Sequence, residues 1–149
     1  MVNVREKEIK EILCDFRKRT NIHYSNLFTD DGFIISTDYS HELGKEDFHQ
    51  SIGAIFATIM AMAENGVELF KEGCKIKSIS IQAGDQLDNE GFTIILDSIT
   101  EDINLSIVFI TFLNLGLILF ELNQTIHKLK TYFSKIHPIK NLEGIGTLN

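Results

Sequence analysis

The segment from Asp47 to Phe70 constrains the fold of this chain more than any other part of its sequence. It carries two neighbouring rows of apolar residues at the alternating three- and four-residue spacing of a helical face. The rows are Phe48, Ile52, Ile55, Ile59 and Met62, and Phe56, Met60, Ala63, Val67 and Phe70. No charged residue occurs between Phe48 and Ala63, and a helix that is apolar nearly all round is typically buried on more than one side. One core within the chain covers one side, and we expect a second protein molecule to cover the other.

Length and composition indicate a single domain. The 149 residues, of which 44% are hydrophobic and 23% charged, predict one compact soluble domain over residues 1–138, followed by a C-terminal tail over residues 139–149. The net charge of −7 at pH 7 argues against a nucleic-acid partner, which needs clustered Lys and Arg. The charged N-terminal residues are unlike a signal peptide, so we expect a cytoplasmic protein. The Ile-, Lys- and Asn-rich, proline-poor composition predicts an archaeal or bacterial source.

The remaining segments predict an α/β sandwich of the α+β type on an antiparallel sheet, with the element order α-β-β-α-β-β-β-α. Asp31-Gly32 lies between two apolar runs, which favours a tight hairpin turn. The expected elements are a helix at 3–20, strands at 22–29 and 33–37, a central helix that starts near Lys45, strands at 74–83, 91–99 and 103–113, and a last helix from Asn114 to His137-Pro138.

Two of the strands have distinct expected positions. Lysines among the apolar residues of the strand at 74–83 are typical of a sheet edge. The near-continuous apolar run from Ile107 to Ile110 indicates a central strand that is covered on both faces. Residues 103–122 are long enough to span a bilayer, but Asn104, Ser106 and Asn114 interrupt them. We therefore expect a strand followed by a helix and no membrane span.

The sequence contains no motif that indicates catalysis, a cofactor or a metal. Gly44-Lys45 lacks the first glycine and the hydroxyl residue of a phosphate-binding loop. The five histidines lack metal-ligand spacing, and Asp30-Asp31 fits a tight turn, where Asp is favoured for backbone reasons. We expect no catalytic residues, no cofactor and no metal, and a non-enzymatic protein that presents surfaces to partners.

Three motifs carry a resemblance to a known family. They are Leu27–Ser36 with its Asp-Gly turn, the alanine-rich stretch Ser51–Ala63, and Asn114–Leu117 at the start of the last helix. In this order and spacing they resemble the Roadblock/dynein light chain family, a module also found in the bacterial gliding GTPase-activating protein and in lysosomal scaffold subunits. The resemblance implies a five-stranded antiparallel sheet with the central helix on one face and the two terminal helices on the other.

The resemblance also implies a function. Members of the family are platforms for small Ras-like GTPases or adaptors in larger assemblies, and they pair through the central helix and the third strand. This pairing agrees with the second molecule and the sheet edge expected from the residues alone. The expected homodimer interface comprises Ile52, Gly53, Ile55, Phe56, Ile59, Met60, Ala63, Lys75, Ile76, Lys77 and Ser78. Polar residues of the central helix, His49, Glu64 and Glu68, are expected to bind the GTPase.

Two alternative functions and one mechanistic question stay open. The alternatives are a small-molecule-sensing module and a longin-like subunit of a trafficking or motor assembly. A sensor needs an apolar pocket of several hundred cubic ångströms, as typical of ligand sites, whereas bulky residues such as Phe56 and Phe109 favour a filled interior. All three arginines, Arg5, Arg17 and Arg19, lie in the first helix. We expect that helix on the face opposite the central one, so stimulation of hydrolysis would act through the switch loops of the GTPase.

Overall fold

The computed structural model describes residues 4–40, 48–84, 91–110 and 113–136. Its elements are α1 (Val4–Thr20), β1 (Tyr24–Thr29), β2 (Ile34–Tyr39), α2 (Phe48–Glu68), β3 (Ser78–Gly84), β4 (Gly91–Ser98), β5 (Ile103–Ile110) and α3 (Leu115–Ile136). This order confirms the predicted α+β fold. The expected tail at 139–149, the predicted helix start near Lys45 and residues 85–90 lie outside the described residues.

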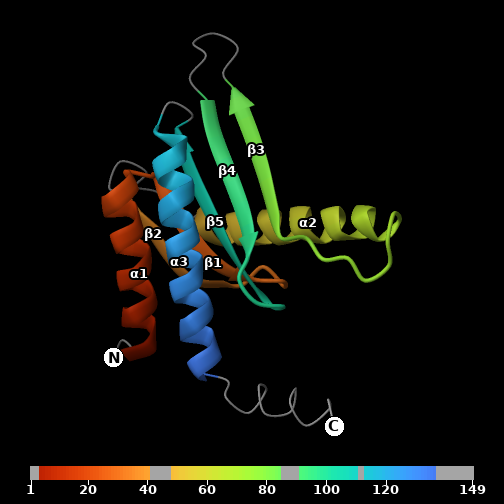
Figure 1. Cartoon of the computed structure of the whole chain (residues 1–149), viewed down its shortest axis with the longest axis horizontal. Coiled ribbons are helices and arrows are strands. Elements are labelled where there is room, and N and C mark those ends of the chain that lie inside the picture. Colours follow the sequence, from red (N-terminus) through yellow and green to blue (C-terminus); the bar gives the residue numbers. More distant parts are fainter. Residues whose placement is uncertain (1–3, 41–47, 85–90, 111–112, 137–149) are drawn as a thin grey trace.

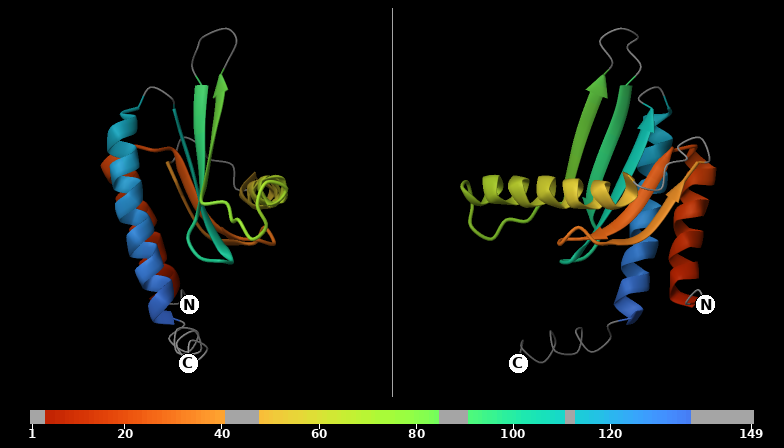
Figure 2. Two further views of the ribbon diagram at one scale, coloured as in Figure 1. Left: turned by 45° about the vertical axis from the view of Figure 1, so that its right-hand side comes forward. Right: turned by 180° about the vertical axis from the view of Figure 1, so that it is seen from behind.

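The five strands form one antiparallel sheet in the order β2-β1-β5-β4-β3. The predictions of a central β5 and an edge strand β3 are therefore confirmed. Helices α1 and α3 lie side by side on one face, and α2 crosses the other face (Figures 1 and 2). Helices thus lie on both faces of the sheet (Figure 2), as the sandwich prediction required.

Alternation along the strands gives each face of the sheet its own hydrophobic core. Leu105, Ile107 and Phe109 of β5 point toward α1 and α3, where they join Leu13 and Leu122. On the other face a smaller core packs beneath α2. Its fully covered members are Phe28, Phe56, Ala57, Met60 and Leu96. Most of the buried apolar surface therefore lies under the terminal helices, and α2 rests on a much smaller core.

The β1–β2 turn has the geometry that the Asp-Gly motif predicts. Gly32 adopts a φ of +89°, a left-handed conformation that residues with a side chain rarely adopt. The amide of Thr29 donates to the carbonyl of Phe33 at 2.9 Å, and the amide of Phe33 donates to the Thr29 hydroxyl at 3.1 Å. These bonds close the hairpin and direct its tip toward α2.

Several boundaries differ by a few residues from the sequence prediction, and two of them, the start of β3 and the end of α2, have a clear physical reason. Strand β3 begins at Ser78 and not at residue 74, because Ile76 packs beneath α2 and draws the preceding segment away from the sheet. Helix α2 ends at Glu68, where the amides of Phe70 and Lys71 both donate to the carbonyl of Val67. Residues 103–122 form a strand and the start of a helix, as predicted. None of the helices in the described part of the chain has both the length and the hydropathy of a bilayer span.

Candidate interaction surface

Helix α2 extends beyond the edge of its own sheet. Its 21 residues correspond to about 31 Å of helix, whereas neighbouring strands lie about 4.8 Å apart. The N-terminal half of α2 crosses the sheet, and the C-terminal half projects past β3 (Figures 1 and 2). Met62, in the projecting half, is 68% exposed, and Leu69, directly after the helix, is 88% exposed. The outward side of the projecting half therefore has no covering partner within the described chain.

The exposed apolar residues of α2, with Leu69 directly after it, form a stripe along the helix. Phe48, Ile55, Met62 and Leu69 recur every seven residues and are all exposed. Ile52 and Ile59 lie between them and are half-buried. Together these six residues, here called the apolar stripe, have the alternating spacing of a coiled-coil seam. A surface with this pattern is typical of a helix that packs against another helix.

The covered side of α2 corrects part of the expected dimer interface. Gly53, Phe56 and Met60 are buried against the sheet of their own chain and offer no surface to a partner. An added Cβ on Gly53 would lie 2.6 Å from the carbonyl oxygen of Gly32, so the helical glycine serves contact with the β1–β2 turn. Of the expected helix positions, Ile55 is exposed, and Ile52, Ile59 and Ala63 are half-buried.

The expected strand positions also separate into different environments. Ser78 lies on β3 and is exposed at the open sheet edge. Lys75 and Lys77 precede the strand, although the amide of Ser98 in β4 still donates to the carbonyl of Lys77 at 3.0 Å. Ile76 is half-buried beneath α2. The open edge of the described sheet therefore starts near Ser78.

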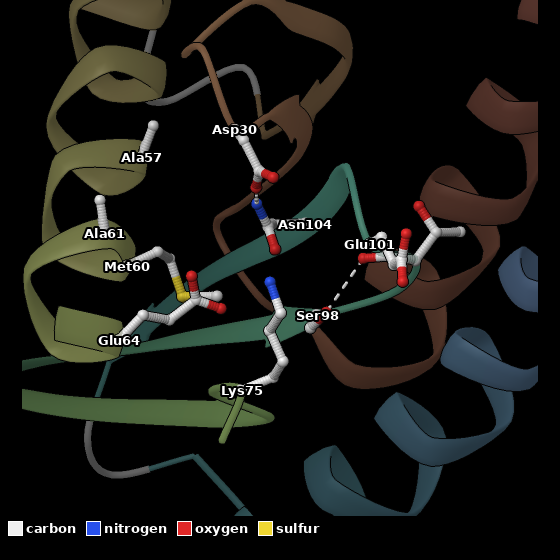
Figure 3. Close-up of a pocket in the computed structure, with 10 residues that line it drawn as sticks. Asp30, Ala57, Met60, Ala61, Glu64, Lys75, Ser98, Glu101 and Asn104 are labelled. Atoms are coloured by element: carbon white, nitrogen blue, oxygen red, sulfur yellow. Dashed lines mark hydrogen bonds between the residues drawn. The ribbon is translucent and has the colours of Figure 1, made fainter. Parts of the chain in front are cut away.

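A cleft of about 270 Å³ opens beside the projecting half of α2. One wall comes from α2 itself, with Ala57, Met60, Ala61 and Glu64. The other walls come from the β1–β2 turn, the segment before β3, the β4–β5 turn and the start of β5 (Figure 3). Their polar residues are Asp30, Lys75, Ser98, Thr100, Glu101 and Asn104. The cleft thus has an apolar wall on the helix and hydrogen-bonding groups around the rest.

Asn104 and Lys75 define the interior of the cleft. Asn104 is 2% exposed, and its amide nitrogen donates to Oδ1 of Asp30 at 3.0 Å. Its amide oxygen accepts no hydrogen bond from the described residues, and in Figure 3 this oxygen and the amine of Lys75 point toward one another. Lys75 makes no ion pair within the described part of the chain. Among the same residues, no three His, Cys, Asp or Glu side chains are grouped closely enough to hold a metal ion.

The three expected GTPase-binding residues occupy different positions. Glu68 is exposed at the end of α2, and Glu64 lines the cleft. His49 is half-buried among aromatic rings: it stacks on Tyr24 with centroids 5.4 Å apart and lies 4.8 Å from the ring of Tyr39. Its Nε2 atom is buried and has no hydrogen-bond partner in the described chain. His49 therefore packs the start of α2 onto β1 and β2, and it is a poor candidate for contact with a partner.

The arginines lie on the opposite side of the molecule, as expected. Helix α1, which carries all three, packs on the face of the sheet away from α2 (Figure 2). Arg17 forms an ion pair with Asp38 of β2 at 2.6 Å, and this hydrogen bond raises the pKa of Arg17. Arg19 lies 3.6 Å from Glu121 of α3. At least these two arginines are engaged in contacts within their own chain.

Sequence reasoning does not bring the cleft residues together. The sequence analysis assigns Glu64 to the expected GTPase-binding surface and Lys75 to the expected dimer interface. It explains Asp30 only as a turn residue. Ser98, Glu101 and Asn104 come from segments that carry no motif. Only the Asp-Gly turn, which directs Asp30 toward α2, is a local signal. The cleft arises from the way five separate segments meet, and no spacing in the sequence encodes it.

The five-stranded sheet, with one helix across one face and two terminal helices on the other, is a Roadblock/LC7-like fold. No family model matches the chain, and none of the curated proteins matches it by sequence. Solved structures do match it. MglB from Myxococcus xanthus has 15% identity over 91% of this chain and 94% of that chain, with a TM-score of 0.76.

Two further solved structures share the fold. The gliding protein MglB from Thermus thermophilus has 16% identity over 89% of this chain and 93% of that chain, with a TM-score of 0.75. A Roadblock/LC7 domain from Streptomyces avermitilis has 11% identity over 83% of this chain and 96% of that chain, with a TM-score of 0.68. At these identities the likeness establishes the fold.

Proposed function

We propose that this protein is a non-enzymatic homodimeric regulator that binds a small Ras-like GTPase. The observation that carries the proposal is the apolar stripe along α2, whose C-terminal part lies on the projecting half of the helix. Full burial of a side chain such as Ile or Met contributes about 1.5–3 kcal/mol, so the four exposed residues of the stripe are costly to leave in water. A second copy of the chain presents the same stripe and can cover it in a two-fold arrangement, in which each helix covers the other.

The open edge of β3 supports the same pairing. Ser78, Ser80 and Gln82 are exposed along this edge, which carries unpaired backbone groups. Antiparallel pairing of two β3 strands would extend the sheet through both subunits. The projecting half of each α2 would then lie over the sheet of the partner. The same dimer would thus cover both the apolar stripe of α2 and the open edge of β3.

The resemblance to the bacterial gliding GTPase-activating protein and the fold shared with MglB support a small GTPase as the external partner. Two paired α2 helices form a platform around a two-fold axis. A GTPase that lies across this axis contacts both subunits and leaves no equivalent place for a second one. We therefore expect one GTPase per dimer. The exposed polar positions of α2, such as Thr58, Asn65 and Glu68, are the helix surface that pairing leaves available.

The dimer is tested by mass and by a matched pair of variants. Met62→Asp places a charge within the apolar stripe and is expected to yield monomer or aggregate by light scattering. Thr58→Asp places the same charge on an exposed position of the same helix outside the stripe, and it is expected to remain dimeric. A monomeric mass for the wild-type protein at micromolar concentration would overturn the proposed homodimer. If both variants became monomeric, the apolar stripe could not be assigned as the dimer interface.

The GTPase is tested by a pull-down from the host with Ras-like GTPases loaded with GDP or a GTP analogue. Selective retention of one GTPase by the wild-type dimer supports the proposal. If no loaded GTPase is retained, the chain acts in another assembly, and an obligate complex with a different chain becomes the better account. The sensing alternative has less support, because the cleft lies at the lower limit of the roughly 300–1,000 Å³ of small-molecule pockets, and its walls are largely polar with carboxylates on several sides.

A further inference from the structure

We propose that the cleft beside α2 receives an arginine side chain of the partner protein. This inference rests on the proposed function and specifies how the partner would be recognised. Asp30, Glu64 and Glu101 place three carboxylates around the cleft against the single ammonium of Lys75. The cleft is therefore complementary to a cationic group. Its volume lies at the lower limit of small-molecule pockets, which leaves room for a single side chain of a partner protein.

The distribution of groups matches the two parts of an arginine side chain. Ala57, Met60 and Ala61 form an apolar wall along α2 against which an aliphatic stem can pack. The acceptors come from Glu64 on α2 and from three other segments, namely the β1–β2 turn, the β4–β5 turn with the end of β4, and the start of β5. A guanidinium carries five N–H donors in a fixed plane and can serve several acceptors at once, whereas an ammonium is a compact point charge. The arrangement therefore favours arginine over lysine.

Asn104 supplies an observation that is independent of the carboxylates. It is 2% exposed, and one end of its amide is fixed by the hydrogen bond to Asp30. Its oxygen is directed into the cleft (Figure 3) and accepts no hydrogen bond from the described residues. The oxygen faces the open cleft in Figure 3, so a donor that enters the cleft can form a hydrogen bond with it. The fixed amide oxygen thus selects a ligand that donates hydrogen bonds.

Lys75 occupies the position that the arginine would take. Its amine points into the cleft toward Asn104, although it forms no ion pair with the described carboxylates. It lies on the segment between α2 and β3, outside any helix or strand, so its side chain can move aside without disturbing the sheet. We therefore assign Lys75 the role of an internal competitor. Its removal should strengthen binding of an external cation.

The cleft and the apolar stripe lie on nearly opposite sides of α2. A rotation of about 100° per residue places Ala57 about 200° from Ile55, and Glu64 about 200° from Met62. A second copy seated on the stripe therefore leaves the cleft open. Each dimer would present two such clefts on the same face as the paired helices. A partner that lies across the two-fold axis can then insert an arginine beside α2 of one subunit.

The first experiment uses a probe and does not need the GTPase. N-acetyl-arginine amide is titrated into the full-length protein, and amide shifts of Asn104, Ser98 and Lys75 are followed by NMR. Neutral N-acetyl-citrulline amide, which has nearly the same shape, is the matched control. Shifts at these residues with arginine and not with citrulline support the proposal. Absent shifts, or equal shifts with citrulline, would overturn it.

Variants connect the probe to the cleft. The double variant Glu64→Gln/Glu101→Gln is expected to weaken binding by at least roughly tenfold, because hydrogen bonds to charged groups contribute more than neutral ones. Lys75→Met is expected to strengthen it. Glu11→Gln on α1 neutralises an exposed carboxylate on the opposite face and should have no effect. If Glu11→Gln weakened binding of the probe equally, the effect would come from the net charge of the protein, and this result would contradict a specific site.

The last experiment separates a partner residue from a free guanidinium compound. The double variant, once shown to keep the mass of the wild-type dimer, is used in the pull-down with loaded GTPases. Loss of the GTPase retained by the wild-type protein supports insertion of a partner arginine. Unchanged retention, with the probe still binding to the wild-type cleft, would overturn the partner assignment in favour of a free ligand. Failure of the wild-type dimer to retain any GTPase would refute the proposed function and leave the probe result standing by itself.

Discussion

Gly53 of α2 and Gly32 of the β1–β2 turn bring two backbones into direct contact. A Cβ on Gly53 would lie 2.6 Å from the Gly32 carbonyl oxygen, and a Cβ on Gly32 would lie 2.9 Å from the Cα of Ala54. The contact fixes the turn, and with it Asp30, against the helix that forms one wall of the cleft. A mid-helix glycine, which costs about 1 kcal/mol relative to alanine, is thereby explained within one chain.

Gly53→Ala is expected to destabilise the protein by about 1–3 kcal/mol, the usual cost of overpacking, despite the higher helix propensity of alanine. Gly66→Ala adds the same methyl group to the same helix at a position where nothing of its own chain lies within 4 Å, and it should raise the stability of the subunit by up to about 1 kcal/mol. Urea unfolding at one protein concentration measures both. A Gly53→Ala protein as stable as Gly66→Ala would show that the two backbones separate easily.

A buried chain of hydrogen bonds joins β5 to β1. The Ser106 hydroxyl donates to Oδ1 of Asn26 at 2.5 Å, and Nδ2 of Asn26 donates to the Tyr24 hydroxyl at 2.8 Å. Asn26→Leu removes the middle member and should cost about 1–3 kcal/mol for each buried group left unpaired. Ser36→Ala is the control, because the Ser36 hydroxyl is buried without a partner in the described chain. Chemical denaturation should show a large loss for the first variant and little change for the second.

Asp97 makes stability depend on pH. Burial raises the pKa of Asp97 above its ordinary value, while its hydrogen bond with Ser78 and the charge of Lys130 act in the opposite direction. The folded chain therefore holds this proton more tightly than the unfolded chain, and the stabilisation is full below the unfolded pKa and lost as pH rises through the folded pKa. Asp97→Asn should increase the free energy of unfolding at neutral pH.

The gain from Asp97→Asn should shrink as pH falls toward 4, near the ordinary value of 3.8 for this carboxyl group. Urea denaturation of both proteins at pH 4 and at pH 7 measures the difference, in which other titrating groups cancel. Asp102→Asn, at an exposed position in the β4–β5 turn, serves as the control. If the gain in the free energy of unfolding were the same at both pH values, the charged form of Asp97 would not destabilise the fold, and the prediction would be wrong.

The arginines should affect stability and not catalysis in the GTPase. Arg17→Ala removes the ion pair with Asp38 and is expected to cost up to about 1 kcal/mol, because the pair is partly exposed. Single-turnover GTP hydrolysis by the saturated complex should be unchanged in Arg17→Ala, and likewise in Arg5→Ala and Arg19→Ala. A large loss of rate in any one variant that still binds would demonstrate an inserted arginine and contradict the assignment of α1 to the far face.

Local sequence signals predict the fold well where short-range chemistry decides the structure. Asp31-Gly32 correctly places the first hairpin, and the apolar run from Ile107 to Ile110 correctly places β5 at the centre of the sheet. Asn114 begins the last helix as expected, and its side chain accepts a hydrogen bond from the amide of Leu117 at 3.1 Å. In each case residues close in sequence fix their own geometry.

Prediction fails where tertiary packing chooses between similar patterns. Both apolar rows of α2 are equally suited to a partner by their spacing, and only the position of the sheet shows that Phe56 and Met60 face inward and Ile55 and Met62 outward. The alternation around Ile76 predicts a strand, but that side chain is drawn beneath the helix. The spacing of apolar residues predicts which faces of a helix are buried. It does not predict whether the sheet or a partner covers each face.

The strand order has a consequence for the timing of folding. Strand β1 pairs with β2 on one side and with β5 on the other, so its second edge has no partner until residues 103–110 have been synthesised. At about 5–20 residues per second, the chain from Asp30 to Asp102 takes roughly 4–15 s to emerge from a ribosome. Throughout that interval the apolar first hairpin stays half-paired. Nascent chains of this protein should therefore depend on chaperones for the β1 edge until the fifth strand arrives.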